Sequence, residues 1–88
     1  MAERLRRSED VVWEQLGEAT LVLDAQNSRY VKLNRTGAAL WEALAEPTDT
    51  DTLVRRLVER HGVDAERAAA DVETFLSHLR ERGLVVAL

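Results

Sequence analysis

Apolar residues alternate with polar ones in the first third of the chain and recur at helical spacing in the remainder. The alternating segments cover residues 11–16, 18–24 and 29–33, and they are separated by Gly17 and by the turn-forming residues 24–28. Short runs rich in β-branched and aromatic residues are typical of strands, and glycine, asparagine, aspartate and serine favour the turns between them. The pattern therefore predicts a meander of three antiparallel strands.

The third strand of such a meander lies at an edge of the sheet. Its outer N–H and C=O groups have no partner unless another segment covers them or pairs with them. Side chains alternate between the two faces of a strand, so each face can be assigned from the sequence. We expect one face to carry Trp13, Leu21, Leu23, Val31 and Leu33, and the other to carry Glu14, Thr20, Val22, Tyr30 and Lys32.

Three helices are predicted after the meander, because cap residues and helix breakers bracket three amphipathic segments. Their expected spans run from Asn34 to before Pro47, from residues 49–52 to Gly62, and from Asp64 to about Arg82, before Gly83. Each segment carries apolar residues three or four positions apart, which predicts a core-facing stripe. These residues are Gly37, Leu40, Trp41 and Leu44, then Leu53, Val54, Leu57 and Val58, then Ala65, Ala68, Ala69, Val72, Phe75, Leu76 and Leu79.

The two ends of the chain give different expectations. Residues 1–9 show no apolar repeat at either period, so we expect a flexible N-terminus. Residues 84–88 are apolar and are expected to cover the core or to form a short strand. A chain of 88 residues supports one modest core. We therefore predict a single α+β domain over residues 10–88.

Composition and charge exclude several classes of function. The chain is 45% hydrophobic and 32% charged, which is typical of a globular domain rather than a disordered segment. A net charge of −4 disfavours nucleic acid and anionic membranes as partners. The sequence has no cysteine, no secretory signal and no membrane-spanning apolar run, so a cytoplasmic location is expected.

No pattern of reactive side chains predicts an enzyme, a cofactor or a metal site. The run Asp49-Thr50-Asp51-Thr52 lacks the glycine and distal glutamate of a calcium loop and is better interpreted as a helix cap. His61 and His78 are too far apart for a zinc-protease pair and fit helix-end or surface positions. Glu9 and Asp10 are paired carboxylates in the polar N-terminus, where we expect no pocket that could make them catalytic.

The sequence pattern alone leaves two interpretations open for a few residues. Tyr30 and Lys32 fit the solvated face of a strand or a binding face. Arg67, Asp71 and His78 border the apolar stripe of the third helix, either as a polar border or as the rim of a site. The first half of that helix is rich in alanine, which would leave space for a side chain of a partner.

The order of these features resembles the PqqD-like proteins, which are also called RiPP recognition elements after the ribosomally synthesised, post-translationally modified peptides they serve. The resemblance covers roughly residues 10–84. Its most specific part is the RY-x-x-LN-x-T-G stretch of residues 29–37, with Trp41 four residues beyond the glycine. The remaining matches are hydrophobic spacing at residues 53–57, 60–64, 71–79 and 83–84.

The resemblance implies a winged helix-turn-helix-like fold, with a three-stranded antiparallel sheet followed by three helices. It also implies that the leader of a precursor peptide adds to the third strand as a fourth antiparallel strand, with the third helix as the other wall of the groove. Main-chain hydrogen bonds would supply affinity and side-chain pockets would supply specificity. The implied peptide-binding residues are Arg29, Tyr30, Val31, Lys32, Leu33, Arg67, Ala68, Asp71, Val72, Thr74 and Phe75.

Within the family, the chain is most similar to the stand-alone leader-binding protein of lasso peptide pathways. This implies a leader peptidase and an ATP-dependent macrolactam synthetase as partners. A PqqD-type chaperone that hands its peptide to a radical SAM enzyme is the alternative. A winged-helix DNA-binding domain is disfavoured because the third helix is net acidic. A homodimer formed through the same edge strand stays open.

Overall fold

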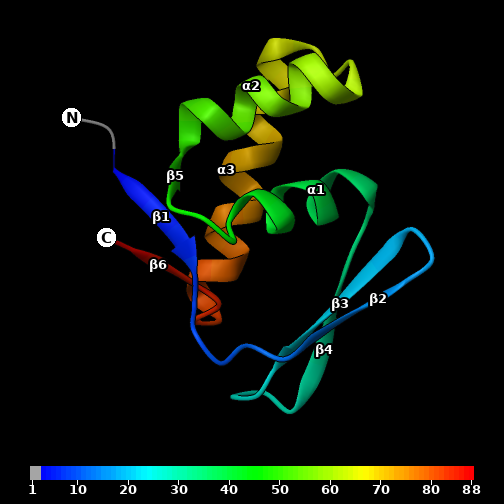
Figure 1. The fold of residues 1–88 in the computed structure, drawn as a ribbon, viewed down its shortest axis with the longest axis vertical. Helices are drawn as coiled ribbons and strands as arrows, with labels where there is room; N and C mark the ends of the chain where they lie inside the picture. The colour runs from blue at the N-terminus through cyan, green and yellow to red at the C-terminus, as the bar shows by residue number, and fades with distance from the viewer. Residues whose placement is uncertain (1–2) are drawn as a thin grey trace.

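The computed structural model describes residues 3–88. In this part of the chain, three helices pack with two small antiparallel sheets (Figure 1). The strands are β1 (Arg4–Arg7), β2 (Trp13–Leu16), β3 (Ala19–Asp24), β4 (Arg29–Leu33), β5 (Thr48–Asp49) and β6 (Val85–Ala87). The helices are α1 (Arg35–Ala43), α2 (Thr50–His61) and α3 (Ala65–Glu81). The structure confirms the α+β class, the three-stranded antiparallel meander and the three helices.

The meander has the order β2-β3-β4, so β4 is an edge strand as predicted. The predicted faces are wrong for β3, however. Leu16 pairs with Ala19 across the two-residue turn, and this register places Val22 opposite both Trp13 and Val31. Opposing residues share a face, so Val22 points toward the core, where it is fully buried. Leu21 and Leu23 consequently lie on the outer face of the sheet.

All three helices begin at the predicted cap residues. The Asn34 side chain accepts a hydrogen bond from the Gly37 N–H at 2.8 Å. Asp49 accepts from the Thr52 N–H at 2.8 Å, and the Asp64 side chain accepts from the first turn of α3. Gly62 ends α2 with a positive φ of 63°, a conformation that glycine adopts without steric cost. These contacts fix where each helix starts and hence which side chains it presents.

The N-terminal segment differs from the expected flexible tail. Strand β1 pairs with β5 on one side and with β6 on the other, forming a second sheet of order β5-β1-β6. Leu5 is fully buried within it. A single apolar residue flanked by arginines carries no periodic signal, which explains why the sequence pattern missed this strand. The apolar C-terminus forms β6, which confirms the expected short strand.

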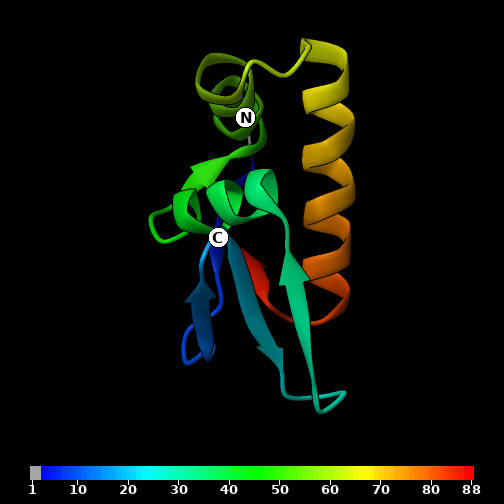
Figure 2. The same cartoon turned by 90° about the vertical axis from the view of Figure 1, so that its right-hand side faces the viewer.

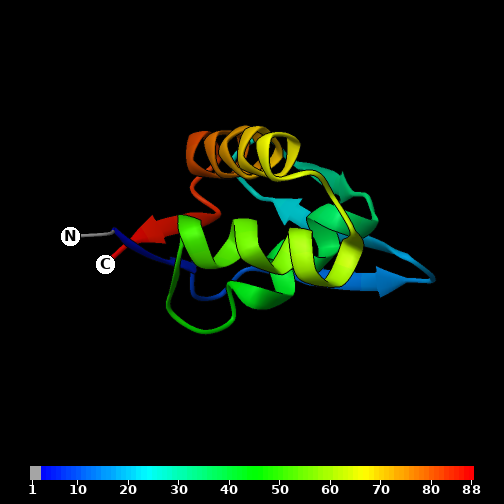
Figure 3. The same ribbon diagram turned by 90° about the horizontal axis from the view of Figure 1, so that it is seen from above.

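The core lies between the helices and the inner face of the meander. Its buried apolar side chains are Leu5, Val22, Leu33, Leu40, Trp41, Leu44, Leu53, Leu57, Ala68, Val72, Leu76, Leu79, Leu84 and Val85. Figures 2 and 3 show β4 as the strand of the meander nearest α3, with β2 on the far side. The fold therefore places an edge strand beside the longest helix. Of the helices in residues 3–88, none has the length and apolar character needed to cross a membrane.

Candidate functional site

The free edge of β4 presents the main-chain groups of Tyr30 and Lys32. The Leu23 N–H donates to the Val12 carbonyl at 2.8 Å, so the odd-numbered residues of β3 face β2. Main-chain groups alternate sides along a strand, and the even-numbered residues of β3 therefore bond to β4. Through the register, these even residues pair with residues 29, 31 and 33. The N–H and C=O groups of Tyr30 and Lys32 consequently point away from the sheet.

No strand within residues 3–88 pairs with this outer edge. The Tyr30 side chain is 56% exposed, and the Lys32 side chain is also exposed. An edge with free donors and acceptors is a template for another strand. The edge predicted from the sequence is therefore present and accessible, and its two outward residues are now identified.

A cavity of about 580 Å³ lies at the carboxyl end of β4, between the start of α1 and the first three turns of α3. Residues from three segments line it: Asn34, Thr36, Gly37 and Leu40 from the start of α1, Gly62, Val63 and Asp64 from the loop before α3, and Arg67, Asp71, Thr74 and Phe75 from α3. Asn34, which lines the cavity, directly follows the last residue of β4, so the cavity begins where this strand ends. We call the β4 edge together with this cavity the edge groove.

Of the six α3 residues that the resemblance implied for peptide binding, four line the edge groove and two are buried in the core. Arg67, Asp71, Thr74 and Phe75 line the edge groove, together with the junction between β4 and α1. Ala68 and Val72 do not, because both are fully buried in the core. The expectation that the alanines leave space for a partner is therefore wrong at Ala68, whose methyl group is already enclosed by this chain.

The residues predicted on β4 differ in exposure. Arg29, Tyr30 and Lys32 are exposed, Val31 is half-buried and Leu33 is buried beneath the start of α1. Val31 and Leu33 belong to the inner face, so they support the edge from behind. Within β4, a partner strand would therefore meet mainly the backbone and the side chains of Tyr30 and Lys32.

Asn34 and Gly37 line the edge groove as well, and sequence reasoning assigned them only a cap and a core position. A Cβ built on Gly37 would lie 3.2 Å from the Asn34 Oδ1 and 3.6 Å from the Phe75 ring. Glycine at this position thus keeps α1 close to its cap and leaves room beside Phe75. The pairing of glycine with a cap three residues earlier was visible in the sequence, but its proximity to Phe75 was not.

The charged groups at the rim of the cavity are weakly paired. Arg67 lies 3.8 Å from the Asp71 carboxylate, and the two side chains are 79% and 45% exposed. Such an exposed pair contributes roughly 0 to 1 kcal/mol to stability, so both groups remain available to a ligand. The cavity therefore combines an aromatic wall with one positive group, Arg67, and two acidic residues, Asp64 and Asp71.

The other end of the edge groove is held by Asp24, at the turn between β3 and β4. Its carboxylate accepts hydrogen bonds from the Asn27 side chain at 2.8 Å and from the Asn27 N–H at 3.3 Å. These hydrogen bonds lower the pKa of the Asp24 carboxyl; burial opposes this effect, and the nearby charges of Arg29 and Arg82 assist it. The carboxylate is thus ionised at neutral pH and fixes the turn that leads into β4.

Within residues 3–88, no cluster of three or more histidine, aspartate and glutamate side chains could hold a metal ion. The arrangement offers main-chain hydrogen bonds and a side-chain cavity. These are the elements of a site that binds an extended polypeptide.

Comparison with known proteins identifies similar solved structures. The structure described as "TbiB1 in Complex with the TbiA(beta) Leader Peptide" has a TM-score of 0.78 and 24% sequence identity, over 91% of this chain and 93% of that chain. "Lasso peptide synthetase B1 complexed with the leader peptide" has a TM-score of 0.77 and 21% identity, over 93% of this chain and 96% of that chain. At these identities the likeness establishes a shared fold. A search of curated proteins found no match.

The sequence itself matches one family. Residues 19–85 match the family described as Coenzyme PQQ synthesis protein D (PqqD). This range begins at β3, includes the RY-x-x-LN-x-T-G stretch and all three helices, and ends at the start of β6. The match spans well over half of the chain, so it confirms the resemblance drawn from the sequence. The chain belongs to the PqqD family.

Proposed function

We propose that this protein is a non-catalytic adaptor that binds the leader segment of a ribosomally synthesised precursor peptide. The observation that carries the proposal is the free edge of β4 beside α3, with the main-chain groups of Tyr30 and Lys32 directed outward. Membership of the PqqD family supports it. Both similar solved structures hold a leader peptide, which supports the same class of ligand.

In this proposal the leader pairs with β4 as a fourth antiparallel strand. Tyr30 and Lys32 each offer one donor and one acceptor to it. Alternate side chains of the leader face α3, and one of them enters the cavity lined by Phe75 and Thr74. The main-chain bonds supply affinity that depends little on sequence, and the cavity selects the register.

The remaining contacts are assigned by position. Arg67 and Asp71 contact the leader at the rim of the cavity, while Arg29 contacts it at the other end of β4. Val31 and Leu33 act from the inner face, where they hold the strand against the core. Ala68 and Val72 position α3 and make no direct contact, because they are buried.

We place the adaptor in a lasso peptide pathway, where it presents the leader to a leader peptidase and an ATP-dependent macrolactam synthetase. The descriptions of the two similar structures favour this assignment over a chaperone for a radical SAM enzyme. The proposal also includes a winged helix-turn-helix-like arrangement and a cytoplasmic location. It keeps the single functional domain expected over residues 10–88 and extends it to include β1. Tethering the leader raises the effective concentration of the attached core peptide at the processing enzymes.

The experiment that tests this proposal is a titration with the leader peptide encoded beside this protein, labelled with a fluorophore and followed by amide NMR shifts of the protein. We expect saturable binding, with shifts concentrated at residues 29–33 and 67–75. A scrambled leader of the same composition is the control. Equal binding of both peptides, or shifts that avoid these two segments, would refute the proposal.

A further inference from the structure

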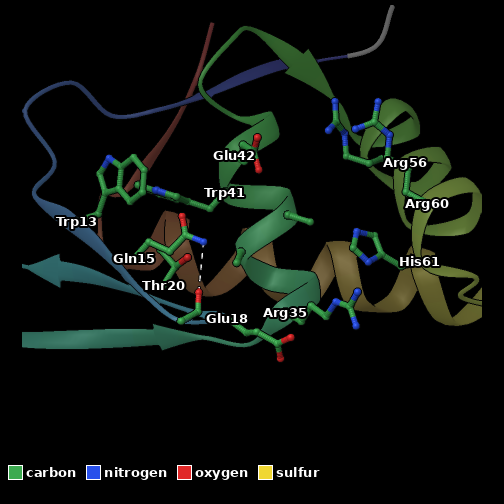
Figure 4. A pocket seen from close by; sticks show the side chains of 13 residues that line it. Trp13, Gln15, Glu18, Thr20, Arg35, Trp41, Glu42, Arg56, Arg60 and His61 are labelled. Atoms are coloured by element: carbon green, nitrogen blue, oxygen red, sulfur yellow. Dashed lines mark hydrogen bonds between the residues drawn. The ribbon is translucent and has the colours of Figure 1, made fainter.

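A second cavity, of about 510 Å³, lies on the opposite side of α1 from the edge groove. The turn of the β2–β3 hairpin, α1 and the second half of α2 line it (Figure 4). Thr36, Gly37 and Leu40 of α1 face the edge groove, whereas Arg35 and Glu42 line this second cavity. Helix α1 therefore separates two hollows that can be occupied independently.

Three arginines and a histidine gather at one end of this cavity. Arg56, Arg60 and His61 approach it from α2, and Arg35 approaches it from the start of α1 (Figure 4). We call these four residues the cationic cluster. The chain as a whole carries a net charge of −4, so the charge of the three arginines is opposite in sign to that of the whole chain. It creates a local field that attracts carboxylates.

The arginines of the cationic cluster have no anionic partner of their own. Within residues 3–88, Arg35, Arg56 and Arg60 make no ion pair and donate no side-chain hydrogen bond. Arg80 and Arg82, by contrast, lie against Glu3 and Asp24. Arg56 and Arg60 are also four positions apart on one helix, a spacing at which like charges repel. The fold thus holds three unpaired guanidinium groups around one hollow.

The rest of the lining indicates which kind of anion fits. Glu18 and Glu42 also line the cavity, and Trp13 lies at the end away from α2, with 42% of its surface exposed. A chain of phosphates would meet repulsion from the two glutamates. A protein segment of mixed composition meets no such conflict, because it can place carboxylates on the arginines and an apolar side chain on Trp13 and the alanines of α1.

We propose that the cationic cluster is a second docking site, which binds an acidic segment of a partner protein while the edge groove holds its own ligand. Arginine binds carboxylates through paired, charge-assisted hydrogen bonds, so the unpaired guanidinium groups supply both affinity and orientation. The site lies on the other side of α1 from the edge groove. Docking there therefore leaves the β4 edge free.

The test uses the full chain and an acetylated hexapeptide in which glutamate alternates with leucine, which we call the acidic probe; the same peptide with glutamine in place of glutamate is the neutral probe. We expect the acidic probe to shift the side-chain Nε–H signals of Arg35, Arg56 and Arg60 saturably, and the neutral probe to leave them unchanged. The double variant Arg56→Gln, Arg60→Gln should bind the acidic probe about tenfold more weakly. Arg55→Gln is the matched control, because Arg55 lies on the same helix outside the cavity.

Three outcomes would overturn the proposal. These are no shift at the three arginines, an equal loss of binding in Arg55→Gln, or tighter binding of inorganic triphosphate than of the acidic probe at the same signals. The third outcome would assign the cavity to a phosphate-bearing ligand. Leader binding by the double variant is measured in parallel. If the double variant still binds the leader, then its loss of binding at the cationic cluster is independent of the edge groove.

Discussion

The Asp24 carboxylate lies 3.7 Å from the Arg82 Nε, and this contact joins the end of β3 to the end of α3. Asp24 is fully buried, and Arg82 also donates to the His78 carbonyl at 2.9 Å. The same carboxylate holds Asn27 in the turn before β4. One buried acid therefore sets the position of β4 relative to α3, which form the two walls of the edge groove.

Replacing Asp24 by asparagine should lower stability at neutral pH and weaken leader binding. Asparagine loses the charge attraction to Arg82. It also has an NH2 group in place of one carboxylate oxygen, so it can accept only one of the two hydrogen bonds from Asn27. Urea unfolding and leader titration measure the two effects. Asp51→Asn is the control, since Asp51 is exposed in the first turn of α2. An Asp24→Asn variant with unchanged unfolding and affinity would remove the proposed role.

The stability of the protein should fall in acid. The pKa values of Asp24 and Asp49 both lie below the usual 3.8, mainly through hydrogen bonds from Asn27 and Thr52 respectively. A lowered pKa in the folded state stabilises the fold above the unfolded value, and the stabilisation is lost as pH falls through the folded value. The urea concentration at the unfolding midpoint should therefore fall as the pH is lowered below about 4. The fall should be shallower in Asp24→Asn than in the natural protein. If the urea midpoints of the natural protein and of Asp24→Asn fell in parallel with pH, Asp24 would not be a source of the acid sensitivity.

Proline at position 32 should weaken leader binding with little effect on the fold. It removes an N–H that points outward, and its ring occupies space beside the free edge. We expect at least about a fivefold loss of affinity, which corresponds to one lost hydrogen bond of about 1 kcal/mol.

Two variants control for the effect of proline. Lys32→Ala keeps the N–H and should bind nearly as well as the natural protein. Val31→Pro removes an N–H that faces β3 and should destabilise the sheet itself. Leader binding by Lys32→Pro equal to that of Lys32→Ala would contradict strand addition at this edge.

A large side chain at Thr74 should block the cavity of the edge groove. Thr74 is exposed and lines the cavity, so tryptophan there fills space without entering the core. We expect about a tenfold loss of leader affinity with an unchanged circular dichroism spectrum. Glu73→Trp is the matched control, because its side chain lies outside the cavity. An equal loss in both variants would show that the cavity does not select the leader.

A charge at Ala68 is not a useful probe, since burying it should unfold the protein.

Leu5→Ala should destabilise the protein by about 2 to 5 kcal/mol, as expected for a fully buried leucine. Urea unfolding measures the change in free energy. Arg6→Ala in the same strand is the control and should cost much less, because its side chain is only partly buried. Unchanged stability in Leu5→Ala would mean that β1 contributes nothing to the fold.

Local signals in the sequence predicted the helices and the edge strand well. Asn34, Asp49 and Asp64 are caps whose partners lie two or three residues away, so chain order alone places them. The order of the meander also follows from short turns. Long-range features were not accessible in this way. Strand β1 depends on partners more than forty residues distant, and its one buried residue gives no repeat.

The faces of β3 and the role of Ala68 were misassigned for a related reason. A two-residue turn sets Leu16 opposite Ala19, which shifts the buried set of β3 by one position to Val22. Ala68 falls on the apolar stripe of α3, but periodicity does not distinguish a residue enclosed by its own chain from one that faces a groove. The cationic cluster was missed because its members come from two helices and carry no common motif.

Amide hydrogen exchange at β4, measured with and without the leader peptide, tests strand addition at this edge most directly. In the free protein the Val31 and Leu33 amides should exchange slowly, because they bond to β3, and the Tyr30 and Lys32 amides should exchange quickly. We expect saturating leader to slow exchange at Tyr30 and Lys32 and to leave exchange at Val31 and Leu33 unchanged. Saturated binding with Tyr30 and Lys32 still exchanging at the free rate would contradict strand addition to β4.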